Sequence, residues 1–324
     1  MKHISIIVPL GHTSISNIES TKQLFSHVNG LLKSQGKEGM FEVKLVGLTE
    51  FTSQQNDQFT IKPDVLLHDV DKTDLIVIPA IIGDPAKVIE ANKAFIPWIL
   101  KQREAGAEIA SYCVGAFFLA ATGLLDGKQC ATHWYSANHF RKLYPKVNLL
   151  DDKIVTEDAG IYTSGGAFSY LNLLIHLIGR YAGREIAIYI AKSYMIDIDR
   201  YTQSPFIIFE GQKKHDDMPI KKIQEYIETH FEEKTSVDDL ATTFGIGRRT
   251  LERRFKAATS NTISEYIQRV KIEAAKKEFE IGKKNLTEVM FSVGYNDVKG
   301  FRTIFKKITG LSPVSYRNKY SKQV

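Results

Sequence analysis

Residues 109–116 place a cysteine between an apolar strand and a run of small residues. A buried strand that ends at Cys113 and continues through Val114 and Gly115 into a helix has the layout of a nucleophile elbow. The turn would expose the sulfur, and the N-terminus of the helix would lower the pKa of the thiol. Backbone amides at this turn, with Gly83 at the end of the preceding strand, would form an anion-binding pocket. We therefore expect a ligand pocket or a reactive thiol at Cys113, the alternative being a small residue that only fits a tight turn.

The elements that must position this turn alternate between strand-like and helix-like segments. The apolar run at residues 74–80 is typical of a parallel strand that is buried on both faces. Strands are also predicted at residues 4–10, 41–47 and 108–112, with a hairpin at 154–157 and 161–163. Helices are predicted at residues 18–34, 85–105, 115–122 and 167–180. This alternation predicts an α/β fold, doubly wound around a mostly parallel, flavodoxin-like sheet.

Chain length and charge both predict a second domain of a different kind. The 324 residues exceed what one hydrophobic core usually holds. From residue 213 onward there are 23 Lys and Arg against 15 Asp and Glu, and no strand pattern remains, whereas residues 1–212 carry 20 basic and 22 acidic side chains. Pro205, Gly211 and a polar cluster indicate a linker at 199–218. We expect an α/β domain at 1–198 and an all-α domain at 219–324. The basic domain favours nucleic-acid binding, the alternative being a solvated Lys-rich surface.

Other classes of protein find no support in the sequence. Two cysteines, Cys113 and Cys130, are too few for a secreted disulfide framework, and Cys130 is interpreted as a buried apolar residue of a strand. Residues 4–10 form a first strand and lack the features of a signal peptide. No apolar run approaches the ~20 residues needed to span a bilayer. We expect a cytoplasmic protein that does not bind membranes, with no metal site and no cofactor.

Two C-terminal segments follow the same helix-turn-helix plan. In residues 237–258 the helices meet at Gly245, and in residues 286–307 they meet at Gly294, with Asn296 or Asp297 as the cap of the following helix. Glycine tolerates the positive φ that such a sharp turn requires. The helix at residues 263–281, which lies between the two units, would span roughly 28 Å. That length suits two reading helices placed in major grooves one turn of DNA apart.

The C-terminal segments resemble the DNA-binding domain of AraC-type regulators over about 100 residues. The resemblance rests on Asp239-Leu240-Ala241, residues 249–256, Val293-Gly294-Tyr295-Asn296-Asp297, residues 301–306, Thr309-Gly310-Leu311-Ser312-Pro313 and Tyr316-Arg317. It implies that double-stranded DNA is a partner and that the bases are read by Arg249, Glu252, Arg253, Val298, Lys299, Arg302 and Thr303. We expect Lys256, Lys306 and Lys307 to contact phosphates.

Two positions depart from that family's pattern. Gly247 stands where the first reading helix usually has a hydroxyl residue as its cap, and glycine is an acceptable N-cap. Residues 259–263 replace the usual Thr-Gly-Xaa-Ser-Pro of the turn between the units, so the resemblance leaves the shape of this turn open.

The N-terminal part resembles PfpI-type proteases and class I glutamine amidotransferases. The matching segments are residues 109–116, 120–128, 131–134 and 162–166. This order, followed by an AraC-type domain, is similar to that of GlxA-type transcriptional regulators. It implies a domain that senses a small, nitrogenous metabolite or dimerises.

The resemblance also bears on catalysis, because a cysteine nucleophile needs a base and an orienting group. Hydrolytic relatives carry His directly after the cysteine, where this chain has Val114, and an acidic residue where it has Ser16. His133 is the base candidate that remains. We therefore expect Cys113, Val114, Gly83, His133 and Ser16 to line an effector pocket without catalysis. A cysteine amidohydrolase joined to a DNA-binding domain and a thiol redox sensor remain alternatives. The sequence leaves open the effector, the operator, activation or repression, RNA polymerase as a partner of an activator, and a homodimer.

Overall fold

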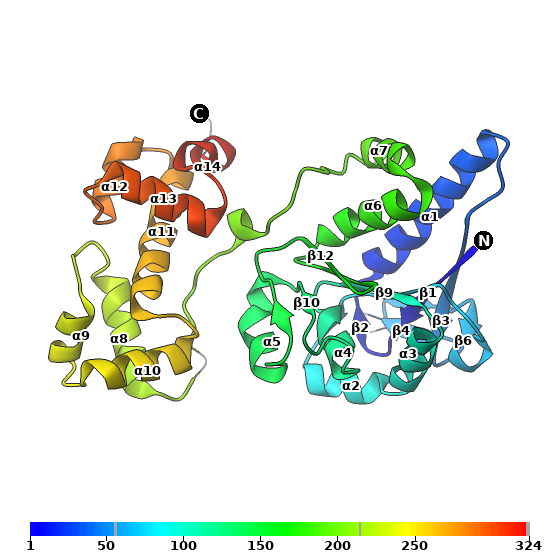
Figure 1. Ribbon diagram of the computed structural model, residues 1–324, viewed down its shortest axis with the longest axis horizontal. Helices are drawn as coiled ribbons and strands as arrows, with labels where there is room; N and C mark the ends of the chain where they lie inside the picture. Colours follow the sequence, from blue (N-terminus) through cyan, green and yellow to red (C-terminus); the bar gives the residue numbers. More distant parts are fainter. Residues whose placement is uncertain (55–56, 214, 322–324) are drawn as a thin grey trace. The chain divides into compact units, whose positions relative to one another are not determined.

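The computed structural model describes residues 1–54, 57–213 and 215–321. The chain divides into two compact units, residues 1–203 and residues 204–324 (Figure 1). We describe each unit by itself. Among the described residues, no helix combines the length and the apolar character that crossing a membrane requires.

The first unit is built on a seven-stranded sheet in the order β12-β13-β9-β7-β1-β3-β6. The strands are β1 (Lys2–Val8), β3 (Phe41–Gly47), β6 (Val65–Leu66), β7 (Leu75–Ile78), β9 (Glu108–Tyr112), β12 (Val155–Asp158) and β13 (Ile161–Ser164). Neighbouring strands run parallel except for the antiparallel β12–β13 pair. The prediction of a mostly parallel, doubly wound sheet is confirmed.

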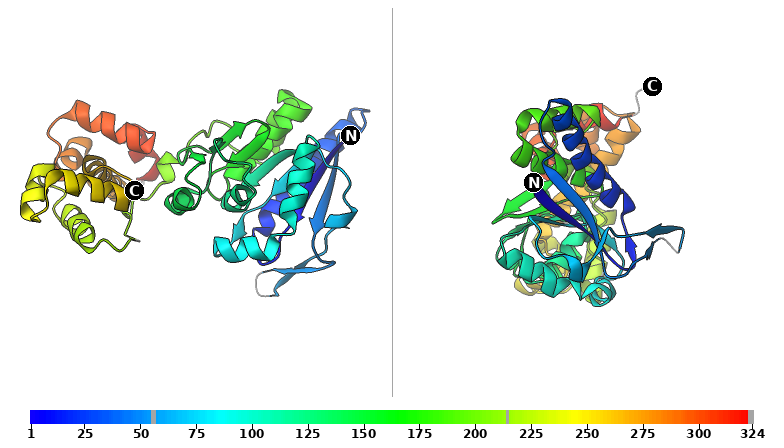
Figure 2. Two further views of the ribbon diagram at one scale, coloured as in Figure 1. Left: turned by 60° about the horizontal axis from the view of Figure 1, so that its bottom comes forward. Right: turned by 90° about the vertical axis from the view of Figure 1, so that its right-hand side faces the viewer.

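Helices cover both faces of this sheet (Figure 1, Figure 2). On one face α1 (Ile15–Ser34), α6 (Ser169–Ala182) and α7 (Arg184–Ser193) pack in one hydrophobic core. On the other face α2 (Pro85–Asn92), α3 (Phe95–Glu104), α4 (Gly115–Ala121) and α5 (Ala137–Leu143) pack in a second core. All four residues of β7 are fully buried, as its continuous apolar sequence predicts.

The prediction of one continuous helix at residues 85–105 is wrong, because the structure has two helices there. The chain leaves α2 after Asn92 and enters α3 at Phe95. Pro97 lies in the first turn of α3, where its missing N–H is harmless. Inside one continuous helix, the Pro97 ring would clash with the carbonyl of Lys93 and break the helix.

Short elements complete the first unit. They are β2 (His12–Thr13), β4 (Thr52–Gln54), β5 (Phe59–Ile61), β8 (Ile81–Ile82), β10 (Gln129–Cys130), β11 (Asn148–Leu149), η1 (Leu67–Asp69) and η2 (Trp134–Ser136). The β2–β8 pair is antiparallel and follows the carboxyl ends of β1 and β7, next to the turn that holds Cys113.

The regular elements of the second unit, among its described residues, are all helices. Its elements are η3 (Ser204–Phe206), α8 (Met218–Thr229), α9 (Val237–Thr243), α10 (Arg248–Thr259), α11 (Ile263–Ile281), α12 (Leu286–Ser292), α13 (Val298–Thr309) and α14 (Pro313–Tyr320). The long helix α11 has the bounds predicted from the sequence. Its first half packs in a core with α8, α9 and α10, and its second half packs in a core with α12, α13 and α14.

The chain that precedes α8 lies along α11. The backbone N–H of Phe209 donates to Glu273, and the Lys276 ammonium donates to the carbonyl of Ile207. Gly211 has a positive φ of 72°, and a Cβ there would lie 2.3 Å from the Tyr266 hydroxyl. Part of the segment interpreted from the sequence as a linker is therefore packed on the second unit.

Candidate functional site

Cys113 forms a strained turn between β9 and α4. Its φ is +53°, a value that residues other than glycine rarely adopt. The Cys113 N–H donates to the carbonyl of Ser164 over 3.1 Å, and the Thr132 hydroxyl donates to the Cys113 carbonyl over 2.9 Å. A Cβ at Gly115 would lie 2.5 Å from the Pro79 carbonyl oxygen, so only glycine fits there. The elbow expected from the sequence is present, and its conformation is imposed by the surrounding strands.

The elbow opens into a cavity of about 420 Å³. Four of the predicted pocket residues, Ser16, Cys113, Val114 and His133, line it. Its other lining residues are Ser14, Asn17, Ala80, Ile82, Tyr135, Ser136, Ala167, Phe168 and Tyr170. The aromatic side chains among them were missed by sequence reasoning, because they come from η2 and from the start of α6, far along the chain from Cys113.

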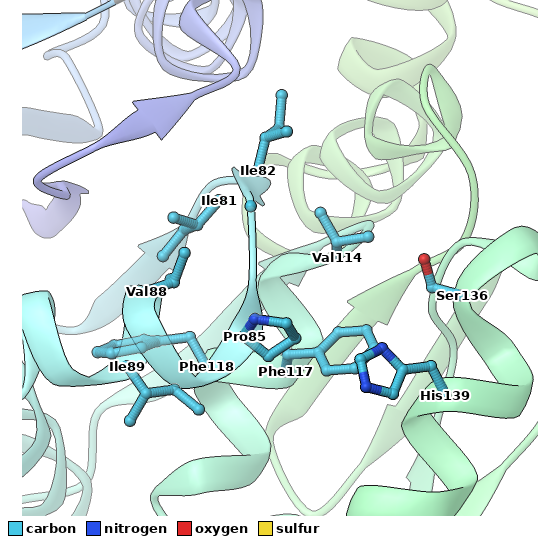
Figure 3. A pocket seen from close by; sticks show the side chains of 11 residues that line it. Ile81, Ile82, Pro85, Val88, Ile89, Val114, Phe117, Phe118, Ser136 and His139 are labelled. Carbon is cyan, nitrogen blue, oxygen red and sulfur yellow. The ribbon is translucent and has the colours of Figure 1, made fainter.

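Gly83 lines a neighbouring cavity of about 210 Å³ and not the elbow cavity (Figure 3). This second cavity lies between α2, α4 and the segment that leads into α5. Apolar side chains from Ile81 to Phe118 form most of its wall, and Ser136 and His139 are its two polar side chains.

The thiol of Cys113 is buried and held in its protonated form. Only 7% of the residue is exposed, and burial raises the pKa of the thiol to about 11, although a hydrogen bond with the backbone of Val114 acts in the opposite direction. The expectation that a helix N-terminus lowers this pKa is therefore wrong. Helix α4 has only seven residues, and desolvation of the charged thiolate outweighs its effect. Cys130 is fully buried in β10, as predicted.

His133 is arranged to donate a hydrogen bond. Its Nδ1 accepts from the backbone N–H of Tyr135 over 3.1 Å, so the neutral ring carries its proton on Nε2. Burial lowers the pKa of His133, which favours the neutral ring. Among the described contacts, no hydrogen bond joins His133 to Cys113. The pair suits binding of a polar group better than activation of the sulfur.

Gln203 holds the loop behind His133, and sequence reasoning missed it. Its side-chain Nε2 lies 2.9–3.1 Å from the carbonyl oxygens of Thr132, Asp151 and Lys153. Its Oε1 accepts from the backbone N–H of Gly166 over 2.6 Å. A Cβ at Gly165 would lie 2.3 Å from the Gln203 side chain. Because Gln203 is the last residue of the first unit, the loop beside the elbow cavity is tied to the chain that leads into the second unit.

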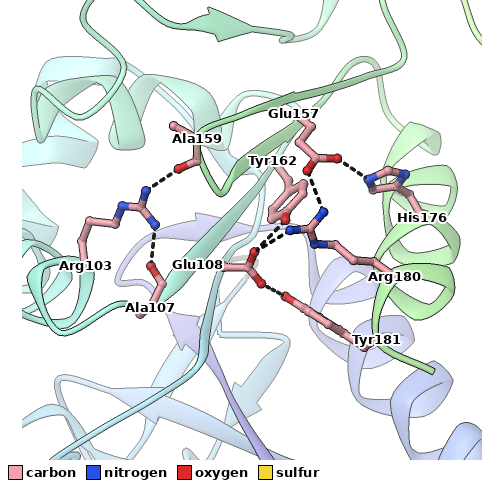
Figure 4. Close-up of polar contacts among 9 residues, drawn as sticks. All are labelled: Arg103, Ala107, Glu108, Glu157, Ala159, Tyr162, His176, Arg180 and Tyr181. Carbon is pink, nitrogen blue, oxygen red and sulfur yellow. Dashed lines mark hydrogen bonds and ion pairs between the residues drawn. The ribbon is translucent and has the colours of Figure 1, made fainter. Parts of the chain in front are cut away.

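A polar cluster lies at the other end of β9 from Cys113 (Figure 4). Glu108 accepts from the hydroxyls of Tyr162 and Tyr181. Arg180 pairs with Glu108 over 3.5 Å and with Glu157 over 2.9 Å. Burial and the neighbouring Glu108 carboxylate raise the pKa of both tyrosines. The cluster ties α6 to the sheet and lies apart from the elbow cavity.

The first helix-turn-helix unit presents a basic helix face to solvent. Helix α10 buries Leu251 and Phe255. The predicted DNA-contacting residues Arg249, Glu252, Arg253 and Lys256 are all exposed on it. Sequence reasoning missed the role of Arg248, which pairs with Asp238 over 2.9 Å and with Glu252 over 3.3 Å. Arg248 therefore fastens the start of α10 to α9 and orients the Glu252 carboxylate.

The second helix-turn-helix unit has the same layout as the first. Asp297 caps α13 by accepting from the N–H groups of Lys299 and Gly300, which decides between the two predicted caps. Helix α13 buries Phe301 and Phe305. Its exposed residues include all those predicted to contact DNA in this unit, Val298, Lys299, Arg302, Thr303, Lys306 and Lys307.

The turn between the two helix-turn-helix units, at residues 259–263, has the same conformation as the turn that follows the second helix-turn-helix unit. Ser260 adopts a left-handed φ of 59°, and Gly310 adopts 74° at the matching position. The Thr259 and Thr309 hydroxyls both donate to the carbonyl four residues earlier. Thr262 then caps α11 as Ser312 caps α14. The departure of residues 259–263 from the family pattern therefore leaves the shape of the turn unchanged.

Comparisons with known proteins match both units. The DJ-1/PfpI family matches residues 28–178, and a helix-turn-helix domain family matches residues 240–319. The chain is 24% identical to the HTH-type transcriptional regulator GbdR of Pseudomonas aeruginosa over 269 residues, which cover 80% of this chain and 70% of the relative. It is 23% identical to the HTH-type transcriptional regulator GlxA of Rhizobium meliloti over 215 residues, 66% of each chain. A DJ-1 superfamily protein from Salmonella typhimurium, solved as a mutant, shares the fold with a TM-score of 0.50, 18% identity, and coverage of 61% of this chain and 100% of that one.

Proposed function

Because the chain joins a DJ-1/PfpI-family domain to an AraC-type helix-turn-helix domain, we propose that it regulates transcription by binding specific DNA sequences through its second unit. The observation that carries the proposal is the duplicated basic helix. Helices α10 and α13 bury matching apolar positions and both expose basic side chains, with Arg249 and Lys256 matching Lys299 and Lys306, on either side of the 19-residue helix α11. At ~1.5 Å per residue, α11 is about 28 Å long, close to one turn of DNA.

The exposed faces of the two helices divide into base-reading and phosphate-binding residues. Arg249 and Arg253 on α10, and Arg302 on α13, are the proposed guanine readers, because a guanidinium group can donate two hydrogen bonds to guanine O6 and N7. Among the described contacts, these three guanidinium groups have no ion pair, so they are available to DNA. Further base-reading residues in the proposal are Glu252, Val298, Lys299 and Thr303. Lys256, Lys306 and Lys307 fix the helices on the phosphate backbone.

The first unit is proposed to bind a small effector in the elbow cavity without reacting with it. The buried, protonated thiol of Cys113 is a poor nucleophile, and Val114 offers no base. Ser16 and His133 supply polar contacts instead. An effector that prefers one arrangement of the loop around Gly166 would also act on Gln203, and so on the start of the second unit. RNA polymerase is a further partner if the chain is an activator, and a homodimer would double the number of reading helices.

The experiment that tests the DNA-binding proposal is selection of binding sites from random DNA by the full chain. We expect a motif with two short conserved blocks about 10 base pairs apart, one for each reading helix. Arg253→Ala should relax one block and Arg302→Ala the other. Lys222→Ala, which removes an exposed charge from α8, should leave both blocks intact. Enrichment of no motif, or of one that neither variant changes, would contradict the proposal.

A further inference from the structure

The elbow cavity and the smaller cavity beside it share three lining residues. Ile82, Val114 and Ser136 line both of them. In the view of Figure 3, Val114 and Ile82 lie across the smaller cavity from Pro85 and Phe117. The two spaces are therefore adjacent, with volumes of about 420 Å³ and 210 Å³, and we call them the larger and the smaller lobe.

The two lobes differ in chemical character. The larger lobe carries hydrogen-bonding groups, among them the Ser16 hydroxyl and the Nε2–H of His133. The wall of the smaller lobe is mostly apolar, and its polar side chains are Ser136 and His139. The apolar part is formed by Ile81, Ile82, Pro85, Val88, Ile89, Val114, Phe117 and Phe118. An apolar cavity of about 150 Å³ is enough to hold benzene, so the smaller lobe has room for a branched chain of a few carbons or one ring.

Apart from the Cys113 thiol and the tyrosine hydroxyls, the only titratable side chains among the described residues that line the lobes are the histidines His133 and His139. The described residues that line them include no Asp, Glu, Lys or Arg, and burial lowers the pKa of His133 toward the neutral ring. Burying an unpaired charge is costly, whereas a neutral amide can be satisfied by hydroxyl and imidazole groups. The lining therefore selects against ligands whose buried part is charged.

We propose that the two lobes join at Val114 into one site, which takes an uncharged, amphiphilic small molecule, with an amide or carbonyl head at the Cys113 elbow and an apolar tail in the smaller lobe. The inference rests on the proposed effector site and names the class of its ligand. Val114 determines the specificity, because its short apolar side chain stands where the lobes meet. A larger polar residue at that position would separate the head group from the space for the tail.

The test measures binding of a graded series of neutral amides to the full chain. Acetamide, 3-methylbutanamide and phenylacetamide share one head and differ in the tail. Burial of each methylene should strengthen binding about fourfold, so the three extra carbons of 3-methylbutanamide should give roughly 60-fold. The ions 3-methylbutanoate and 3-methylbutylammonium carry the same tail and should bind at least about tenfold more weakly than the amide. Equal affinity across the amides, tighter binding of either ion, or no binding of any amide would overturn the inference.

Variants locate the tail and the head. Val88→Phe fills the smaller lobe and should remove the gain from the longer tails while leaving acetamide binding unchanged. Ala86→Phe, at an exposed position of the same helix, is the matched control and should change nothing. Val88→Ala enlarges the lobe and should shift the preference toward phenylacetamide, which keeps the test valid if Val88→Phe does not fold.

A variant that obstructs the larger lobe at the Cys113 elbow distinguishes failure of this inference from failure of the proposed function. Ala167→Trp narrows the larger lobe and should weaken all three amides together. Amides that still bind this variant with unchanged affinity would show that they enter elsewhere, which overturns the inference. Equal affinities for all tails, lost together in Ala167→Trp, would overturn the tail lobe and leave the effector site standing. DNA binding measured on the same samples tests the regulator independently.

Discussion

Two glycines close the turns of the two helix-turn-helix units, and replacing each by alanine should have unequal effects. Gly245 has a φ of +62°, and nothing lies within 4 Å of the position that its Cβ would take. A left-handed conformation costs an L-residue about 1–2 kcal/mol. The lower entropy of the unfolded alanine chain offsets about 0.4–1 kcal/mol of that cost. We expect Gly245→Ala to lower the free energy of unfolding of the second unit by about 1 kcal/mol.

Gly294 has the same type of backbone, with a φ of +73°, but no space around it. A Cβ there would lie 2.1 Å from the carbonyl oxygen of Glu232 and 2.7 Å from the ammonium nitrogen of Lys271. The ammonium can move, whereas the carbonyl belongs to backbone that must shift as a segment. Overpacking of this kind adds about 1–3 kcal/mol. We expect Gly294→Ala to cost the second unit about 2–4 kcal/mol in total.

Urea unfolding of the full chain measures both variants and contains its own control. Circular dichroism reports the helices of both units, so the transition of the second unit is the part of this signal that the tryptophan fluorescence does not share. The chain has two tryptophans, Trp98 and Trp134, and both lie in the first unit, so their fluorescence should follow an unchanged transition. Equal losses for the two variants would refute the reasoning, because it attributes the difference to the Glu232 carbonyl. A shift in the tryptophan transition would show that the effect is not confined to the second unit.

Three further predictions concern other features of the fold. Ser260→Gly removes the strain of a serine in the left-handed conformation and should raise the stability of the second unit by about 0.5–1 kcal/mol. The control Ala257→Gly, inside α10, should lower the stability by about 1 kcal/mol. If urea unfolding shows no gain for Ser260→Gly, the turn is not strained as described. The folded pKa of Cys113, about 11, exceeds its ordinary value of 9, so the stability linked to its protonation is complete below pH 9 and is lost as the pH rises toward 11. Tryptophan-monitored unfolding should therefore lose stability above pH 9 more steeply in the wild type than in Cys113→Ser, and parallel curves would argue against a buried thiol. Gln203→Leu leaves several buried backbone groups unpaired and should cost the first unit about 2–4 kcal/mol in the same assay, and a loss below about 1 kcal/mol would refute its role in holding the loop.

The sheet could be predicted because its signal is local. The sequence of β7 is a short apolar run that indicates a buried strand, and β3 and β9 have the bounds that the sequence predicts. The helix predicted at residues 85–105 failed because apolar periodicity continues across the break, and the position of Pro97 carried the missing information. The turn at Ser260 was also within reach, since the matching Gly310 stands 50 residues later in the same surroundings.

The chemistry of the site depends on tertiary structure and was harder to predict. The sequence identifies the turn at Cys113, but the burial that raises the pKa of its thiol comes from elements distant in the chain. No sequence pattern around Gln203 indicates its role. The only related feature in the sequence is the pair of glycines at residues 165–166, which leave room for the Gln203 side chain. The exposed faces of α10 and α13 were predictable because helical periodicity alone fixes which side chains face away from the core.

The most direct test of the central claim compares two alanine variants on the selected DNA site and on a scrambled site, over a range of salt concentrations. Arg253→Ala should cost about 1–3 kcal/mol of discrimination between the two sites. Lys306→Ala should weaken binding to both sites alike and make the dependence on salt less steep. If Arg253→Ala keeps full discrimination, or if both variants weaken all DNA equally, α10 does not read bases in the way proposed for it.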